Sequence, residues 1–324
     1  MKREIEYLIP RLRNKEKLRI IALGDSISFG VGDHGGHDEA IGPGWAGRFA
    51  HDLKAEKFVN VSRNGARVLD LLKHQMGAAL EGQFDLALIC IGGNDVLRGN
   101  YNPYDVKVGL EHLINKLHHN GTAVALINLP HLSRPIRLPK IVRRIFELRA
   151  NKLNEVLMQV CEQNGARFIS LDKIPQMSEK RFWHSDRMHP SSYGHQLISD
   201  RVRRTLSLPR RSRQKLPSNL AHQSRWTAIR WLLIKGSVWV ARRSIDLLPA
   251  IAFLIIREVI FKPKWLKNSD LKSKLTIVTE SRLFASDFSE REVVIFTNNA
   301  YRATVSNSGG FNKNDLKDFI NFPA

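Results

Sequence analysis

Short apolar runs alternate with longer amphipathic segments over the first 207 residues of the chain. Apolar runs of this length are typical of strands buried on both faces, whereas apolar residues spaced three and four apart indicate helices. The predicted strands are 18–23, 58–61, 84–91, 122–129 and 166–171, and the predicted helices are 43–56, 66–80, 103–119, 139–163 and 190–206. This alternation predicts an α/β fold with a flavodoxin-like, three-layer α/β/α arrangement around a five-stranded parallel sheet.

The pattern changes after residue 207, where a basic, partly helical C-terminal extension is expected. The predicted regions are 1–207 as the α/β domain, 208–267 as a basic linker with amphipathic or apolar helices, and 268–324 as a small C-terminal region of unknown role. The Trp- and Leu-rich stretches 226–240 and 245–261 are interrupted or bounded by charges, so neither has the roughly 18 uninterrupted apolar residues of a spanning helix. A strand pair is expected around 275–278 and 293–297.

The basic residues are concentrated in one part of the chain. The formal net charge is +20, and residues 201–267 hold sixteen lysines and arginines against only Asp246 and Glu258. Such an excess favours an anionic partner. Arg and Lys interleaved with Trp and Leu favour a membrane surface, bound through 208–267. Nucleic acid is the less favoured partner, and packing of these helices on the α/β domain as ordinary core stays open.

Cysteine usage and the amino terminus bear on the compartment. Cys90 falls within a strand pattern and Cys161 within a helical one, so both are expected to be small buried side chains without a disulfide framework. Residues 1–17 are charged throughout and lack the apolar core of a secretory signal. We therefore expect a cytoplasmic protein, peripheral at the membrane if the basic region binds lipid.

Candidate chemistry begins at Ser26, which directly follows the first predicted strand within Gly-Asp-Ser. Far along the chain, Asp186 and His189 stand three positions apart, just before a helix that opens on Pro190. A serine hydroxyl is a poor nucleophile until an imidazole takes its proton and a carboxylate orients that imidazole. Ligands of parallel sheets bind beyond the carboxyl ends of the strands, where all three residues are expected.

Two further positions follow the second and third predicted strands. Gly65 ends the segment Ser-Arg-Asn-Gly, and a glycine there lets the backbone approach a bound anion without a Cβ in the way. Asn94 lies in Gly-Gly-Asn-Asp and offers two N–H donors through its amide. Both positions therefore belong to the same expected edge of the sheet as the serine and the histidine.

Together these segments resemble the SGNH hydrolases of the GDSL lipase/esterase family over about residues 18–207. The matching blocks are Gly24-Asp25-Ser26, Gly65, Gly92-Gly93-Asn94-Asp95 and Asp186-x-x-His189-Pro190, with Trp45 and Gly194-His195 as further echoes. The resemblance implies a catalytic triad of Ser26, His189 and Asp186. It also implies an oxyanion hole made of the backbone N–H groups of Ser26 and Gly65 and the side-chain amide of Asn94.

Other polar residues near these motifs receive structural interpretations. Asp25 is expected to brace the turn before the nucleophile, and Asp95 to cap or brace its own turn. His131 could line an acyl pocket or lie on the surface, and His195 is expected to be an ordinary helix residue.

A group of potential metal ligands, Asp33, His34, His37, Asp38 and Glu39, lies in a Gly-rich loop. It lacks fixed ligand spacing, so no metal and no cofactor are predicted.

The expected function is that of a serine esterase or lipase-type hydrolase acting on a carboxylic ester or thioester through an acyl-serine intermediate. The substrate would be a small-molecule or lipid ester, with lipid-derived acyl chains favoured if the basic region touches membrane. The alternative is a membrane- or nucleic-acid-binding protein that uses the hydrolase fold as a scaffold. Hydrolysis and acyl transfer to another alcohol are not separated by these residues.

Overall fold

A computed structural model of the chain divides into two compact units, residues 1–267 and 268–324. The structure describes residues 5–14, 16–33, 43–130, 140–208, 292–296 and 302–306. The predicted domain boundary between 207 and 208 falls where the described range 140–208 ends, so it stays a prediction. The helices expected at 226–240 and 245–261 lie outside the described residues and also stay predictions.

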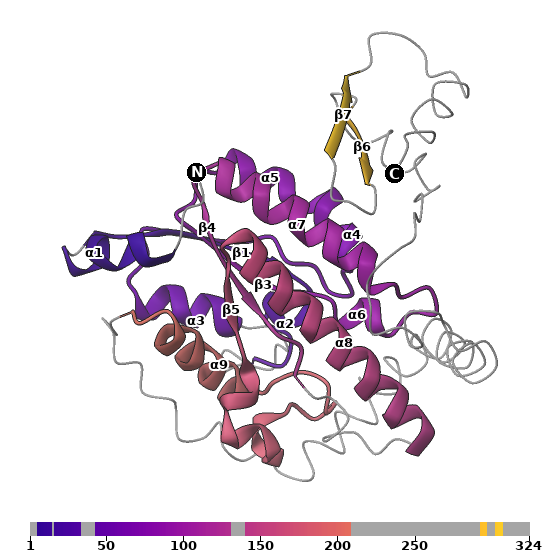
Figure 1. The fold of residues 1–324 in the computed structure, drawn as a ribbon. Coiled ribbons are helices and arrows are strands. Elements are labelled where there is room, and N and C mark those ends of the chain that lie inside the picture. The colour runs from indigo at the N-terminus through magenta and orange to yellow at the C-terminus, as the bar shows by residue number, and fades with distance from the viewer. Residues whose placement is uncertain are drawn as a thin grey trace, which may run out of the picture. The chain divides into compact units, whose positions relative to one another are not determined.

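The first unit is built on a five-stranded, fully parallel sheet (Figure 1). Its strands are β1 (Arg19–Gly24), β2 (Lys57–Asn60), β3 (Leu86–Cys90), β4 (Ala123–Ile127) and β5 (Arg167–Ile169). They lie in the order β2-β1-β3-β4-β5, which is the flavodoxin-like order. All five predicted strands and the predicted fold class are therefore confirmed.

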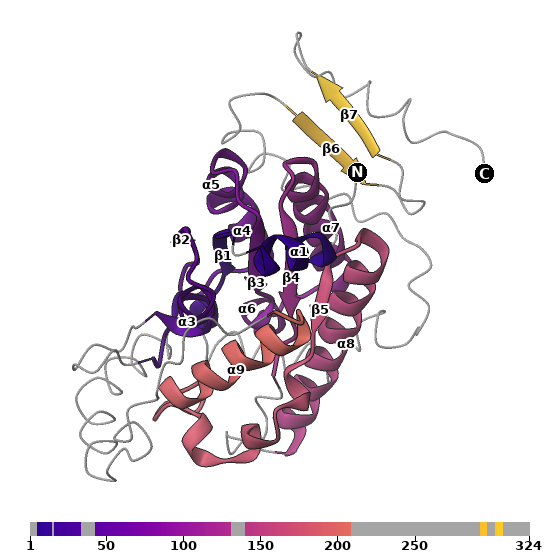
Figure 2. The same cartoon turned by 90° about the vertical axis from the view of Figure 1, so that its left-hand side faces the viewer.

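Helices cover both faces of the sheet (Figure 2). The longer ones are α3 (Gly44–Asp52), α4 (Val68–His74), α5 (Met76–Glu81), α7 (Pro103–His119), α8 (Lys140–Asn164) and α9 (Ser192–Thr205), and the amino terminus adds η1 (Ile5–Tyr7) and α1 (Leu8–Arg13). Helix α3 packs against α9 on one face, and α7 packs against α4 and α8. The apolar sides of α3 and α9 bury Trp45, Phe49 and Val202 against β1, β3 and β4.

One predicted helix, 66–80, is two helices in the structure. Helices α4 and α5 meet at Gln75, which is fully buried. The side-chain amide of Gln75 donates to the carbonyl of Gly24 at 2.9 Å and accepts from its backbone N–H at 2.8 Å. This pairing satisfies the last residue of β1 much as a neighbouring strand would, and it explains why a polar residue interrupts the apolar face of the segment.

The loops at the carboxyl ends of the strands contain short helices that the periodicity does not predict. These are α2 (Ser26–Phe29), α6 (Gly93–Val96), η2 (Leu171–Lys173), η3 (Pro175–Ser178) and η4 (Lys180–Phe182). Helical runs of three or four residues are too short to show a 3.6-residue period. Within the part of the chain that the structure describes, no helix has the length and apolarity needed to cross a membrane.

In the second unit the described residues form an antiparallel pair, β6 (Glu292–Phe296) and β7 (Arg302–Ser306). The strand expected around 293–297 is therefore present. Its described partner is β7, which follows it in sequence, while the partner predicted at 275–278 lies outside the described residues.

Candidate active site

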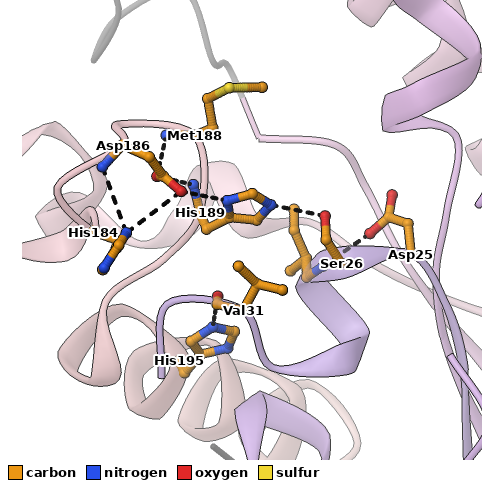
Figure 3. Close-up of polar contacts among 9 residues, drawn as sticks. Asp25, Ser26, Val31, His184, Asp186, Met188, His189 and His195 are labelled. Atoms are coloured by element: carbon orange, nitrogen blue, oxygen red, sulfur yellow. Dashed lines mark hydrogen bonds and ion pairs between the residues drawn. The ribbon is translucent and has the colours of Figure 1, made fainter. Parts of the chain in front are cut away.

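Ser26, His189 and Asp186 form one hydrogen-bonded chain at the carboxyl edge of the sheet (Figure 3). The Oγ of Ser26 lies 2.8 Å from Nε2 of His189, and Nδ1 of His189 lies 2.7 Å from Oδ2 of Asp186. A carboxylate only accepts, so Nδ1 carries the proton and Nε2 is left to accept from the serine hydroxyl. Folding thus brings together residues 163 positions apart in the arrangement that activates a serine.

The loop that carries His189 is closed at its base. Trp183 and Pro190 form an antiparallel bridge, and the backbone N–H of His184 donates to the carbonyl of His189 at 2.8 Å. Inside the loop, Oδ1 of Asp186 accepts from the backbone N–H of His189 at 3.0 Å. These bonds fix the carboxylate and the imidazole relative to each other before any substrate arrives.

The Asp186 carboxylate remains ionised in this setting. Burial by itself would raise its pKa, but hydrogen bonds from His184 and His189 outweigh burial and hold the pKa of Asp186 well below its ordinary value. The ring of His184 is almost completely buried, with Nδ1 3.4 Å from Oδ2 of Asp186. A permanently charged Asp186 can stabilise the imidazolium that forms when His189 takes a proton.

Ser26, the predicted nucleophile, is the first residue of the short helix α2. Asp25 is the N-cap of this helix, and its Oδ1 accepts from the backbone N–H of Ile27 at 3.0 Å. Burial raises the pKa of Asp25 to about 6. Asp25 thus braces the turn, as predicted, while the adjacent Ser26 is only 8% exposed.

Three N–H donors near the nucleophile remain available for an oxyanion. The backbone N–H groups of Ser26 and Gly65 find no acceptor among the residues that the structure describes. The amide of Asn94 donates one hydrogen to the carbonyl of Ala66 at 3.0 Å, which leaves its second hydrogen free. Ala66 directly follows Gly65, so this bond ties the amide donor to the backbone donor.

The backbone conformation adds a second reason for a glycine at position 65. A Cβ added there would meet nothing within 4 Å, so neighbouring protein atoms do not exclude it. The backbone, however, has φ of +82°, which side chains rarely adopt. Glycine is needed to turn the N–H into place, and the open space beside it is left for a ligand.

A second buried polar cluster holds residues 31–33, which follow the helix that begins at Ser26. Asp33 forms a bidentate ion pair with Arg48, with contacts of 2.6 and 2.8 Å. His195 accepts the backbone N–H of Trp45 on Nδ1 at 3.1 Å and donates from Nε2 to the carbonyl of Val31 at 3.0 Å. We call these two pairs, Asp33–Arg48 and His195 with its backbone partners, the backing cluster.

The pKa shifts in the backing cluster give a neutral His195 and an ionised Asp33. Burial lowers the pKa of His195 to about 4, so the ring is neutral. Burial would raise the pKa of Asp33, but the Arg48 guanidinium overrides it and keeps that pKa below its ordinary value. Between the two clusters, a Cβ at Gly32 would lie 2.3 Å from the carbonyl of Pro190, so only glycine permits this close approach.

Some sequence-based assignments need correction or fall outside the described residues. Asp95 does more than brace its own turn: both its carboxylate oxygens accept from the backbone N–H of Val68, at 3.4 and 3.2 Å, and so link α6 to the start of α4. Asp33 is committed to Arg48. His131 and the remaining loop residues of the suspected metal group, His34, His37, Asp38 and Glu39, lie outside the described residues.

Several residues of the site carry no motif signal. His184 stands two positions before Asp186, and only the folded loop shows that the two side chains meet. Arg48 is a buried polar residue within the amphipathic helix α3, and Gln75 is a buried polar residue between α4 and α5. Their place among apolar residues is the signal that could have marked them. Within the described residues, no three potential metal ligands come together.

Comparison with known proteins agrees with these observations. The model of the GDSL-like lipase/acylhydrolase family matches residues 22–197, which span the nucleophile turn and the histidine loop. No curated protein sequence matches the chain. Among solved structures, a psychrotrophic esterase, EstA, from Pseudoalteromonas sp. is 17% identical with a TM-score of 0.46, covering 59% of this chain and 97% of that one.

Two further solved structures give similar figures. A catalytic mutant of Axe2, an acetylxylan esterase from Geobacillus stearothermophilus, is 20% identical with a TM-score of 0.47, covering 60% of this chain and 97% of that one. TesA is 23% identical with a TM-score of 0.45, covering 58% of this chain and 97% of that one. In each case the similarity covers about three fifths of this chain.

Proposed function

The chain belongs to the GDSL-like lipase/acylhydrolase family, and we propose that it is a serine esterase that cleaves a carboxylic ester or thioester through an acyl-serine intermediate on Ser26. Cleavage of ester bonds follows from the family. The acyl-serine route is supported by one observation above all: the unbroken hydrogen-bonded chain from Ser26 through His189 to Asp186.

In the first half of the reaction, Oγ of Ser26 attacks the acyl carbon while Nε2 of His189 takes the hydroxyl proton. Asp186 holds the ring in the required tautomer and stabilises its positive charge. The carbonyl oxygen becomes an oxyanion, which the N–H groups of Ser26 and Gly65 and the amide of Asn94 are suited to bind.

When the tetrahedral intermediate collapses, the bond to the leaving oxygen or sulfur breaks, and His189 returns the proton to that atom. A water molecule then attacks the acyl-serine, gives a proton to His189, and releases the carboxylic acid and the free Ser26 hydroxyl. An alcohol in place of water would turn hydrolysis into acyl transfer by the same steps.

A direct test replaces the nucleophile. Ser26→Ala should lower kcat/KM for p-nitrophenyl butyrate by at least about 10⁴-fold, because the proposed acyl intermediate forms on the Ser26 hydroxyl. Ser28→Ala is the matched control: its hydroxyl is also buried, two positions away, and lies 3.5 Å from the carbonyl of Cys90. Unchanged turnover by Ser26→Ala would remove the proposed mechanism.

The proposed membrane partner rests on the basic region 208–267. Residues 201–267, which include this region, hold sixteen cationic residues against two acidic ones. If this region binds a bilayer, lipid-derived acyl chains become the favoured substrates. The full-length protein should sediment with vesicles that contain anionic lipid, less so with purely neutral vesicles, and less at high salt. Failure to sediment with anionic vesicles at low salt would count against this partner.

A further inference from the structure

Arg187 lies between Asp186 and His189 in the loop that carries His189, and its backbone conformation is unfavourable. Its φ is +60°, in the left-handed region that glycine adopts readily and residues with a side chain disfavour. Its backbone N–H donates to the carbonyl of His184 at 3.0 Å, and the next N–H, of Met188, donates to Oδ1 of Asp186 at 2.9 Å. The geometry of the triad loop imposes this conformation, so glycine would be the favoured residue on backbone grounds.

The side chain kept at this unfavourable position is an unpaired cation. Arg187 is partly exposed, and its guanidinium has no hydrogen bond or ion pair with any residue that the structure describes. By contrast, the buried guanidinium of Arg48 is bonded to Asp33, and that of Arg149 donates to the carbonyls of Val96 and Arg98.

The carboxylates that are described at this edge of the sheet are already engaged. Asp186 accepts from His189, Asp33 from Arg48, Asp25 from the N–H of Ile27, and Asp95 from the N–H of Val68. Each of them meets a donor within the protein. Among the described residues, no carboxylate forms an ion pair with Arg187.

Two neighbouring loops carry further unpaired cations. Arg63 is exposed two positions before Gly65, and Arg98 is partly exposed four positions after Asn94. Neither guanidinium has an ion pair or hydrogen bond with the described residues. Each loop that contributes a triad residue or an oxyanion donor after β2, β3 and β5 thus also contributes at least one uncompensated positive charge. Charges of one sign around a site attract ligands of the opposite sign.

We propose that the ester cleaved at Ser26 carries an anionic oxygen group, a carboxylate or a phosphate, and that Arg187 determines this specificity. The inference rests on the proposed serine esterase function and names its substrate class. Arginine suits the role because its planar guanidinium can bind either group through two parallel hydrogen bonds. Arg187 directly follows Asp186 and is two residues from His189. A charge placed there would explain why this position carries a side chain although its backbone favours glycine.

Two pairs of esters test the proposal and separate the possible places of the charge. On the acyl side, p-nitrophenyl monoadipate is compared with p-nitrophenyl methyl adipate. On the alcohol side, 1-acetylglycerol 3-phosphate is compared with 1-acetylglycerol by acetate release. We expect the wild-type protein to prefer the anionic member of at least one pair by about 10-fold in kcat/KM, mostly through KM, and to lose that preference as salt is raised.

Three variants separate charge from backbone strain. Arg187→Gln removes the charge and keeps the strain, and Arg187→Gly removes both, so both should bring the anionic-to-neutral ratio close to one. Arg187→Lys should retain a ratio well above one. The neutral ester, measured on the same preparation, corrects for any change in the triad loop itself.

Lys54 is the matched control within the chain. It too is a cationic residue with positive φ, +52°, but it lies between α3 and β2, at the opposite edge of the sheet. Lys54→Gln should leave the ratio unchanged. A ratio unaffected by Arg187→Gln, or a wild-type ratio of one or less for both pairs, would overturn the inference while Ser26-dependent cleavage of the neutral esters keeps the esterase function intact. Absence of Ser26-dependent cleavage of all four esters would overturn the esterase function and this inference with it.

Discussion

Two buried clusters, each containing an aspartate and a histidine, lie close to the nucleophile and differ in what their imidazoles contact. His189 bonds only to side chains, the carboxylate of Asp186 and the hydroxyl of Ser26. His195, in the backing cluster, has a ring that bonds, among the described residues, to two backbone groups, the N–H of Trp45 and the carbonyl of Val31. Residue types alone do not separate the two.

The difference decides which imidazole can do chemistry. A hydroxyl can give up its proton to His189, whereas a peptide N–H cannot give one to His195 and a peptide carbonyl does not take one. The His195 ring is also completely buried, and its pKa of about 4 keeps it neutral, while the His189 side chain is 12% exposed. The partners of a histidine therefore distinguish a base from a structural brace.

The largest expected effect is the loss of the base. His189→Ala should lower kcat by about 10⁴-fold or more, because Ser26 then has no proton acceptor. The midpoint of thermal unfolding should change little by comparison. Steady-state kinetics beside calorimetry measure both. Substantial turnover in the variant would mean that another group activates Ser26, and that His189 is not the catalytic base that distinguishes its cluster from the backing cluster.

Breaking the backing cluster should lower the stability of the protein strongly and its kcat only slightly. Asp33→Ala leaves the buried Arg48 guanidinium without its partner, and breaking a buried ion pair in this way typically costs about 3–5 kcal/mol of unfolding free energy. Denaturant titration measures the loss, and kcat per folded molecule at low temperature should fall far less than in His189→Ala. A stability close to that of the wild type would show that the pair does not brace the fold.

Removing the side-chain amide of Asn94 tests whether this residue acts together with Ser26 and His189 in the reaction. Asn94→Ala takes away one oxyanion donor and should lower kcat by about 10²–10³-fold with little change in KM. Asn154 is the matched control, because its amide oxygen accepts from the backbone N–H of Leu129 at 2.9 Å and its amide nitrogen donates to the carbonyl of Leu129 at 3.0 Å, so its bonds hold the backbone of that residue. Equal losses of kcat in Asn94→Ala and Asn154→Ala would argue against an oxyanion role for Asn94.

The smallest effect concerns Asp95, a carboxylate that belongs to neither cluster. Burial raises the pKa of Asp95 from 3.8 to about 7, so the folded protein binds this proton more tightly than the unfolded chain. Its contribution to stability is therefore present at low pH and is lost as the pH rises from about 4 to about 7.

Asp95→Asn removes this dependence, since the amide does not ionise and its oxygen can still accept from Val68. At pH 8 the variant should unfold about 2–4 °C above the wild type, which corresponds to about 1 kcal/mol. Thermal unfolding followed between pH 4 and 8 measures the slope. An unchanged slope would show that Asp95 ionises normally in the folded protein.

The sequence predicted the sheet and the positions of the triad because both depend on strong local signals. Continuous apolar runs mark strands that are covered on both faces, and residues that follow parallel strands must meet at one edge. The break at Gln75 could not be predicted in this way, because its cause is a contact with Gly24, 51 positions away. Likewise, the pairing of Asp95 with the start of α4 depends on how two loops pack.

Backbone conformation was the other part that sequence patterns did not reveal. Arg187 has a left-handed φ where a pattern would favour glycine, and Gly65 has a φ of +82° that side chains rarely adopt. The contact between His184 and Asp186 arises only after the Trp183–Pro190 bridge closes the loop. Such features follow from tertiary closure, and neither composition nor periodicity records them.

The central claim, that Ser26 alone is made nucleophilic by His189, is tested most directly by covalent labelling. An activated phosphonate with a p-nitrophenyl leaving group reacts when a serine oxygen bonds to phosphorus and p-nitrophenolate departs. Intact-mass and peptide mass spectrometry should find one adduct on Ser26 of the wild-type protein, and labelling slowed at least about 100-fold in His189→Ala. An adduct on another residue, or equal labelling rates in the two proteins, would contradict the account.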